Sequence, residues 1–264
     1  MYLELVNNAF STMLLDSIGH YHKSKKQKEC FGIVFGDTGE NFTGEYTFPV
    51  GNVVKKTSTS VQANEEVNGV IADAKKLVSM SEVVAYYHSH PYEEMFDNWA
   101  DPSLADLRTA KAIESNIEII VALTKRSSVD ATAKLMLKYQ DEPKSRFWEG
   151  PNATEYNADY MDELGQFIHG HYKDYDFEVR AYKWTGEALE ELSLYSSEVE
   201  MNRALAEAGL SIEDLPKEAM YYLKKLEYSL RLANKEKYKE KIPYLIEKIR
   251  ATYQVEKLDQ QPAQ

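Results

Sequence analysis

The stretch Glu82-Val83-Val84-Ala85-Tyr86-Tyr87-His88-Ser89-His90-Pro91 begins as a short run of apolar, β-branched and aromatic residues, which predicts a buried strand. Because side chains alternate along a strand, His88 and His90 are expected on the same face. Ser103 follows downstream and opens a predicted helix with Asp106 in its first turn. Two imidazoles and one carboxylate are the three protein ligands typical of a catalytic zinc ion. The sequence therefore predicts a zinc centre where the strand ends and the helix begins.

Ser103 and Asp106 also have a simpler interpretation. A serine followed three residues later by an acidic residue is typical of a helix start, with the serine as N-cap and the carboxylate facing the positive end of the helix dipole. Taken alone, this pair is compatible with either role.

The other histidines provide an internal comparison, because all six occur in pairs two residues apart. His20 and His22 close a predicted helix over 4–22, where residues two apart point about 200° away from each other and cannot share a metal. His169 and His171 fall at the predicted frayed end of another helix. We therefore expect these two pairs at the surface.

An earlier apolar run, ECFGIVFG over residues 29–36, predicts a core strand with Glu29 at its entrance. A glutamate at this place is compatible with a solvated strand end. Combined with the histidine strand, Glu29 has the chemistry of the general base in zinc hydrolysis, which takes a proton from water and passes it to the leaving amine. Cys30 is expected to be a small buried hydrophobe and not a nucleophile.

Together, ECFGIVFG, YYHSHP and PSLADL resemble the signature of the JAMM (MPN-plus, JAB) zinc metallopeptidases. The resemblance implies that His88, His90 and Asp106 bind Zn²⁺. It implies that Glu29 activates the zinc-bound water and that Ser103 steadies the tetrahedral oxyanion. It also implies the reaction, which is cleavage of a peptide or isopeptide bond after the C-terminal glycines of a ubiquitin-like or sulfur-carrier β-grasp protein.

One departure from the family concerns the segment between the second histidine and the serine. Residues 91–102 are longer than the usual spacing, and the extra residues YEEMFDNWAD are acidic and aromatic. They keep the ligand types and alter the loop beside the centre, where they could contact a basic face of the modifier. Two alternatives stay open at this point: a zinc hydrolase of small peptides on the same fold, and a non-catalytic MPN scaffold subunit.

The order of predicted elements is a mixture of strands and helices, which is typical of α/β folds. The resemblance implies the cytidine-deaminase-like architecture of MPN domains, a mixed β-sheet sandwiched by helices. We expect the metallopeptidase domain over 1–195, with a partly helical insertion at 141–175, and a helical C-terminal extension over 196–264. That extension is expected to pack on the catalytic domain or to mediate homo- or hetero-oligomer formation. The further predicted elements are strands at 42–49, 117–124 and 133–139, an edge strand at 176–183, helices at 64–80, 217–235 and 242–253, a helix ending at Gly209, and a disordered tail over 257–264.

Composition limits the partners and the location. The formal net charge is −12 and the charges form no basic cluster, so a nucleic-acid partner is not expected. A single cysteine excludes a disulfide framework and favours a reducing compartment. The first residues lack a basic signal region and no apolar stretch reaches the length of a membrane span. A cytoplasmic protein with no membrane association is therefore expected, and its 43% hydrophobic residues suffice for a core.

Overall fold

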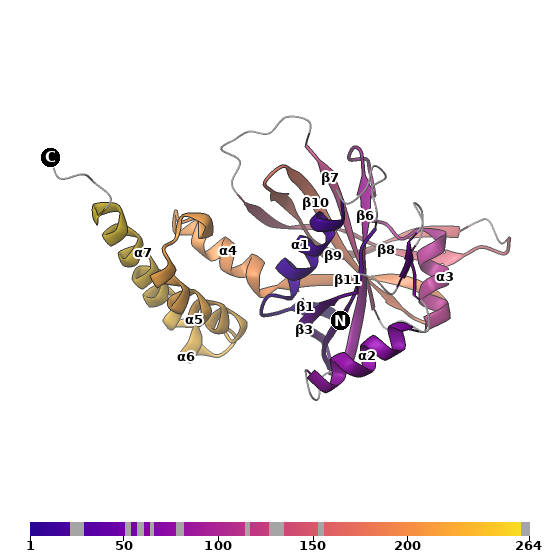
Figure 1. Cartoon of the computed structure of the whole chain (residues 1–264), viewed down its shortest axis with the longest axis horizontal. Helices are drawn as coiled ribbons and strands as arrows, with labels where there is room; N and C mark the ends of the chain where they lie inside the picture. The colour runs from indigo at the N-terminus through magenta and orange to yellow at the C-terminus, as the bar shows by residue number, and fades with distance from the viewer. Residues whose placement is uncertain are drawn as a thin grey trace. The chain divides into compact units, whose positions relative to one another are not determined.

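The computed structural model of the chain describes residues 1–21, 29–50, 54–56, 61–63, 66–77, 82–113, 117–126, 135–152 and 156–259 (Figure 1). The chain divides into two compact units, Met1–Tyr195 and Ser196–Gln264, and each is described by itself.

A closed barrel of strands forms the first unit, and its strand order is β1-β11-β8-β9-β10-β7-β6-β2-β3. Two neighbouring pairs, β6 with β7 and β1 with β3, are parallel, so the sheet is mixed. The strand bounds are β1 Tyr2–Leu5, β2 Phe31–Thr38, β3 Phe42–Pro49, β6 Glu82–Tyr92, β7 Ile117–Lys125, β8 Met136–Glu149, β9 Tyr156–Tyr172, β10 Tyr175–Trp184 and β11 Ala188–Ser196. A separate two-stranded sheet pairs β4 (Val54–Lys56) with β5 (Val61–Ala63). The mixed α/β character expected from the sequence is confirmed.

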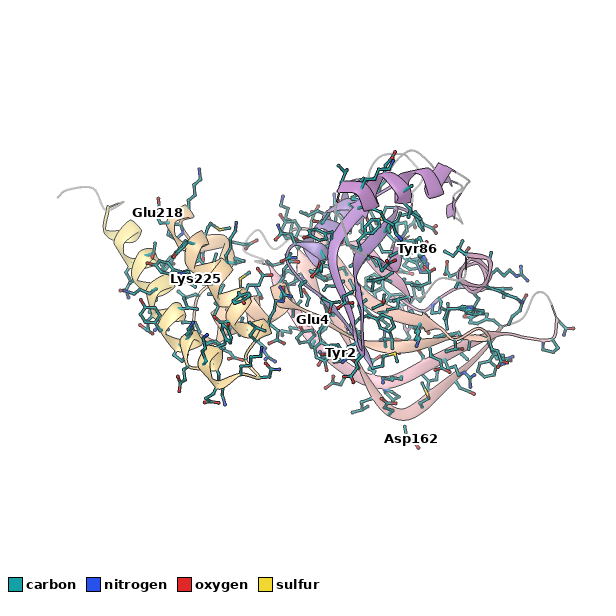
Figure 2. The ribbon with its side chains drawn as sticks, turned by 90° about the horizontal axis from the view of Figure 1, so that it is seen from below. Tyr2, Glu4, Tyr86, Asp162, Glu218 and Lys225 are labelled. Carbon is teal, nitrogen blue, oxygen red and sulfur yellow. The ribbon has the colours of Figure 1, made fainter. Side chains whose placement is uncertain are left out.

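Three helices cover the two faces of the sheet around β6. Helix α1 (Ala9–Tyr21) packs on one face, against β3, β6 and β7. Helix α2 (Glu66–Leu77) packs on the opposite face over β2, in a cluster that includes Phe31 and Tyr86. The rings of these two residues are stacked with centroids 5.8 Å apart, and Tyr86 is labelled in Figure 2. Helix α3 (Leu104–Ile113) covers β7 on that same face. Consecutive residues of β6 therefore serve two different environments.

The long hairpin β8–β9 corrects the expectation of a partly helical insertion at 141–175. Its polar sequence is compatible with strands because some of its charges are paired, as Glu142 is with Arg180 of β10. The buried guanidinium of Arg180 lies 2.6 Å from Glu142, 2.6 Å from Glu178 and 3.0 Å from Glu191. Strand β10, expected at the edge, instead lies inside the sheet, where it pairs with β7 and β9 and also with β11.

Two histidine expectations also need correction. The predicted helix over 4–22 begins only at Ala9, because the preceding residues form β1, in which Leu3 and Leu5 point into the core. His20 is buried and does not lie at the surface, whereas His22 lies outside the described residues. The pair at 169 and 171 lies half-buried on strand β9 and not at a frayed helix end.

The remaining first-unit predictions agree with the structure. The strands expected at 29–36, 42–49 and 117–124 correspond to β2, β3 and β7, and β2 and β3 pair as an antiparallel hairpin. The strand expected at 133–139 begins partly outside the described residues and continues as β8. The helix expected at 64–80 is α2.

The second unit is helical, with its apolar side chains gathered between α4, α5 and α7. Its elements are α4 Ser197–Glu207, the 3-10 turns η1 Ile212–Asp214 and η2 Lys217–Ala219, α5 Met220–Arg231, α6 Glu236–Lys239 and α7 Lys241–Asp259. Gly209 follows α4 with φ +71°, a left-handed conformation that favours glycine, so the predicted C-terminal cap is confirmed. The tail expected to be disordered begins inside α7, and residues 260–264 lie outside the described residues. Over the described part of the chain, none of the helices combines the length and the apolar character needed to cross a membrane.

Candidate metal centre

The end of β6 and the first turn of α3 bring three metal-ligating side chains together. His88 Nε2 lies 3.1 Å from Asp106 Oδ1, and His90 Nε2 lies 3.4 Å from Asp106 Oδ2. The two Nε2 atoms are 3.0 Å apart. All three side chains are buried or nearly so. The alternation of β6 and the start of α3 thus assemble the three residues that the sequence predicts as ligands.

The spacing of these donor atoms fits a zinc ion. Bonds of about 2.0–2.2 Å to nitrogen and oxygen separate the ligand atoms of a tetrahedral zinc ion by about 3.3–3.6 Å. The observed separations are close to this range, and each Nε2 faces the carboxylate. Two imidazoles and one carboxylate leave a fourth position, as in catalytic zinc sites.

Ser103 and Asp106 form a reciprocal cap at the start of α3. The Ser103 backbone N–H donates to Asp106 Oδ2 at 2.6 Å, and the Asp106 backbone N–H donates to Ser103 Oγ at 3.3 Å. The simpler interpretation of this pair is therefore correct, and it does not compete with the metal interpretation. The cap fixes the carboxylate whose two oxygens face the histidines.

Charge interactions within this cluster shift the pKa values of His88 and Asp106 in opposite directions. Although burial favours a neutral ring, the Asp106 carboxylate raises the pKa of His88 well above its ordinary value. Burial likewise opposes ionisation of Asp106, but the neighbouring imidazoles, His88 first, hold its pKa well below the ordinary value. The cluster therefore favours positive charge beside the negative carboxylate. A bound metal cation would supply that positive charge in place of the imidazole proton.

Glu29 immediately precedes β2, whose Phe31 is paired with His88 of β6. It is half-buried. Burial raises its pKa, while the positive charge of His88 and His90 opposes that rise and Asp106 adds to it. Glu29 therefore lies within electrostatic reach of all three ligand candidates. A carboxyl group with a raised pKa exchanges protons more readily near neutral pH.

Sequence reasoning missed two residues that contact the histidines. Glu118 of β7 is buried, and its Oε2 lies 3.7 Å from His88 Nδ1, the nitrogen on the far side of the ring from the carboxylate. The hydroxyl of Tyr92 lies 3.4 Å from His90 Nδ1. A recognisable signal existed for Glu118, because it is the only charged residue in the otherwise apolar run 117–123.

The long segment between the histidines and α3 is anchored at its C-terminal end. The Trp99 indole N–H donates to Glu178 Oε2 at 2.9 Å, and the Tyr182 hydroxyl donates to Asp101 Oδ1 at 3.3 Å. Trp99 and the following alanine are buried. In contrast, residues 93–97 are all exposed, including Met95 and Phe96. The extra length therefore forms an exposed acidic and apolar tip on a fixed base, close to His90.

Comparisons with known proteins agree with this geometry in one respect. Residues 11–135 match a family model described as prokaryotic homologs of the JAB domain, a range that contains all five predicted site residues. No curated protein matches the chain. A solution structure of a Desulfitobacterium hafniense protein is similar at 13% identity, covering 74% of this chain and 92% of that protein, with a TM-score of 0.38.

Proposed function

Because this chain belongs to the JAB domain family through residues 11–135, we propose that it is a zinc-dependent peptidase or isopeptidase. The observation that carries the proposal is the convergence of His88, His90 and Asp106, whose facing donor atoms lie 3.0–3.4 Å apart. These three residues would hold the ion. When bound, zinc would supply Lewis acidity toward the scissile carbonyl and lower the pKa of its bound water to roughly 7.

Glu29 is the proposed proton carrier. Its carboxylate would accept the proton of the attacking water and then donate it to the leaving amine. Its half-buried position and raised pKa support this role, because a carboxyl group that protonates too weakly would not return the proton to the amine. Glu29 is not among the three donors that face one another, so its removal should spare metal binding.

Ser103 is the proposed oxyanion donor. Its Oγ accepts the Asp106 N–H, and a hydroxyl that accepts a hydrogen bond still has its own hydrogen to donate. The same side chain would thus hold the helix start and stabilise the negative charge that develops on the carbonyl oxygen.

The proposed substrate is the C-terminal glycine tail of a ubiquitin-like or sulfur-carrier β-grasp protein, joined to an amine. This substrate follows from the family resemblance. The exposed tip 93–97 supports a protein substrate, since its acidic residues suit a basic face and Met95 and Phe96 offer apolar contact area. Short peptides are the alternative substrate, and they would leave this tip without a role.

We further propose that residues 1–195 form the catalytic domain and that the helical unit over 196–264 mediates oligomer formation or binding to another subunit. Several large side chains of this unit are exposed, including Tyr221 and Tyr244. A cytoplasmic location is proposed from the single cysteine of the chain.

The decisive experiment measures zinc content and cleavage together on the full-length protein. The substrates are a β-grasp modifier that ends in Gly-Gly and is fused to a reporter, and a short peptide with the same scissile sequence. Wild-type protein should bind zinc and release the reporter. Glu29→Gln should keep zinc and lose cleavage, because the glutamine cannot carry the proton.

Glu40→Gln is the matched control, since this glutamate is exposed on the β2–β3 turn and the substitution is chemically identical. It should leave both zinc content and cleavage unchanged. Loss of zinc in Glu29→Gln would show that Glu29 is a ligand and that its assigned role is wrong. A wild-type protein that binds no zinc and cleaves neither substrate would support the scaffold alternative.

A further inference from the structure

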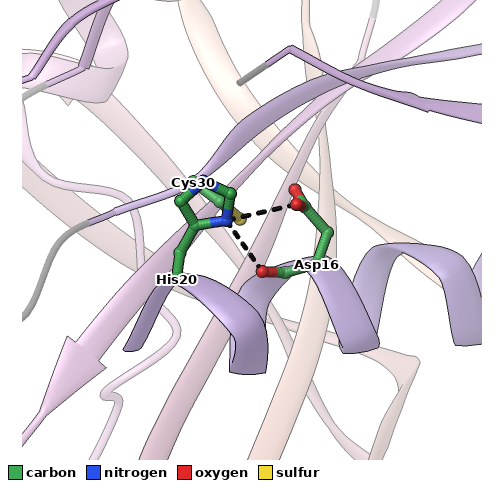
Figure 3. Close-up of side chains that lie close together, drawn as sticks. All are labelled: Asp16, His20 and Cys30. Atoms are coloured by element: carbon green, nitrogen blue, oxygen red, sulfur yellow. Dashed lines mark hydrogen bonds and ion pairs between the residues drawn. The ribbon is translucent and has the colours of Figure 1, made fainter. Parts of the chain in front are cut away.

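A second group of metal-ligating side chains lies between α1 and the sheet, on the face opposite the first centre. Asp16 and His20 are one turn apart on α1, and Cys30 directly precedes β2 (Figure 3). His20 and Cys30 are buried and Asp16 is nearly so. The function proposed above uses none of these three residues.

The faces are separated by the alternation of β6. His88 and His90 point to the side covered by α2 and α3. Tyr87 precedes the two histidines and Ser89 lies between them, and both point to α1. There the Tyr87 hydroxyl donates to Asp16 Oδ2 at 2.8 Å. The two groups are therefore distinct sites on opposite sides of one strand.

The donor atoms of the second group are close to metal-binding spacing. His20 Nδ1 lies 3.1 Å from Asp16 Oδ1, and one ring nitrogen of His20, one carboxylate oxygen of Asp16 and Cys30 Sγ all lie within 4.8 Å of one another. In a tetrahedral zinc site the sulfur and nitrogen ligands are about 3.6 Å apart.

Neighbouring groups orient two of the three donors. The hydrogen bond from Tyr87 occupies Asp16 Oδ2, so that Oδ1 is the oxygen directed toward His20. The Ser89 hydroxyl accepts the Cys30 N–H at 2.8 Å, and the Cys30 carbonyl accepts the Ser89 N–H at 3.3 Å. Hydrogen bonds of this kind around the ligands are a regular feature of metal sites.

The metal-free interpretation is a buried polar pair between Asp16 and His20. His20 Nδ1 is also 2.9 Å from the Asp16 carbonyl, so it could donate its hydrogen there. In that interpretation the Cys30 thiol interacts with Ser17 Oγ at 3.2 Å and with the side chains of Ser89 and Asp16. A bound cation is the partner that would make a thiolate stable at this buried place. One carboxylate, one thiolate and a divalent cation sum to zero charge, which suits a buried site.

We propose that Asp16, His20 and Cys30 form a second metal site for a divalent cation of the zinc class. A set of one sulfur, one nitrogen and one oxygen ligand selects zinc over magnesium or calcium, which take oxygen ligands. The ion would tie α1 to Cys30, the residue next to Glu29. The inference rests on its own three residues and does not require that the chain be a peptidase.

Cobalt substitution tests the proposal, because the chain has one cysteine and the first centre offers only nitrogen and oxygen. A sulfur-to-cobalt charge-transfer band in the near ultraviolet can therefore arise only from Cys30. The full-length protein, stripped with a chelator and titrated with Co²⁺, should bind two equivalents and develop this band with one of them. Cys30→Ser should lose the band and one equivalent, and His88→Ala/His90→Ala should lose one equivalent and keep the band.

His20→Gln should also lose the band, and His171→Gln on β9 is its matched control, which should keep it. If a variant does not fold, X-ray absorption at the zinc edge of the wild-type protein provides an independent measurement. It should show a sulfur neighbour at about 2.3 Å from the zinc. Binding without any sulfur signal in wild-type protein overturns the second site. One equivalent with a sulfur signal supports it and refutes the first centre instead.

Discussion

Asp101 anchors the base of the segment between the two halves of the first centre, and its half-buried carboxylate lies near other acidic groups. Burial raises its pKa from 3.8 to about 6; Arg180 and the Tyr182 hydroxyl oppose that rise, and the nearby Glu191 adds to it. The folded protein therefore binds a proton at this residue more tightly than the unfolded chain. Stability should fall as the pH rises from 3.8 to about 6 and stay lower above it.

The size of this effect follows from the shift. A pKa difference of roughly two units between the folded and unfolded states lowers the free energy of unfolding by at most about 3 kcal/mol above pH 6. This loss of stability disappears below pH 3.8. Asp101→Asn removes the charge and keeps an oxygen that can accept the Tyr182 hydrogen bond. The variant should thus be more stable than wild type at pH 8, by up to about 3 kcal/mol, and equally stable below pH 3.8.

Urea unfolding followed by tryptophan fluorescence measures this directly, because all three tryptophans, Trp99, Trp148 and Trp184, lie in the first unit. The free energy of unfolding of wild type and variant is compared at pH 8 and pH 3.5. Asp162→Asn, on an exposed part of β9, is the control and should show no pH-dependent difference. An Asp101→Asn variant that is less stable at pH 8, or equally shifted at both pH values, would refute the argument.

Three more outcomes are expected around the first centre. Ser103→Ala should retain zinc and lower kcat by about 10²–10³-fold, since an oxyanion donor typically contributes about 2.7–4 kcal/mol of transition-state stabilisation. The same variant should lose about 1 kcal/mol of unfolding free energy, because it lacks the hydroxyl that caps α3. Glu118→Gln should weaken zinc binding by about 10–100-fold in a chelator competition, because it contacts the far nitrogen of a ligand histidine; unchanged affinity would exclude a positioning role. Lysine substitutions at Glu93, Glu94 and Asp97 should raise KM for the modifier fusion and leave KM for the short peptide unchanged. Equal effects on both substrates would show that the tip does not recognise the modifier.

Local patterns predicted the elements of the centre well. The alternation of β6 places His88 and His90 on one face, and the reciprocal cap starts α3 one residue after Ser103. Both features depend on neighbours within a few residues, which is the range over which sequence patterns carry information. The proposed roles of these residues in metal binding and catalysis remain predictions.

Long-range features were not predictable in the same way. The hairpin β8–β9 is rich in charged residues that suggest a loop, and it forms paired strands in which Glu142 contacts Arg180 of β10. Burial of His20 depends on the packing of α1 against β3, β6 and β7, which no pattern within the helix reveals. In both cases the deciding partner lies far away in the sequence, so single-residue tendencies were overridden by tertiary contacts.

Adjacent side chains of β6 lie on opposite sides of the strand: the imidazoles of His88 and His90 on one side, and the side chains of Tyr87 and Ser89 on the other. An insertion or deletion of one residue within 82–90 would move every later side chain of the strand to the opposite side. Both groups of metal-ligating residues would then lose their contacts with β6 at once. The exposed tip at 93–97 carries no such coupling, so length changes there should leave the two clusters intact. For protein engineering, tags or spacers belong in the tip, and the strand before it should keep its length.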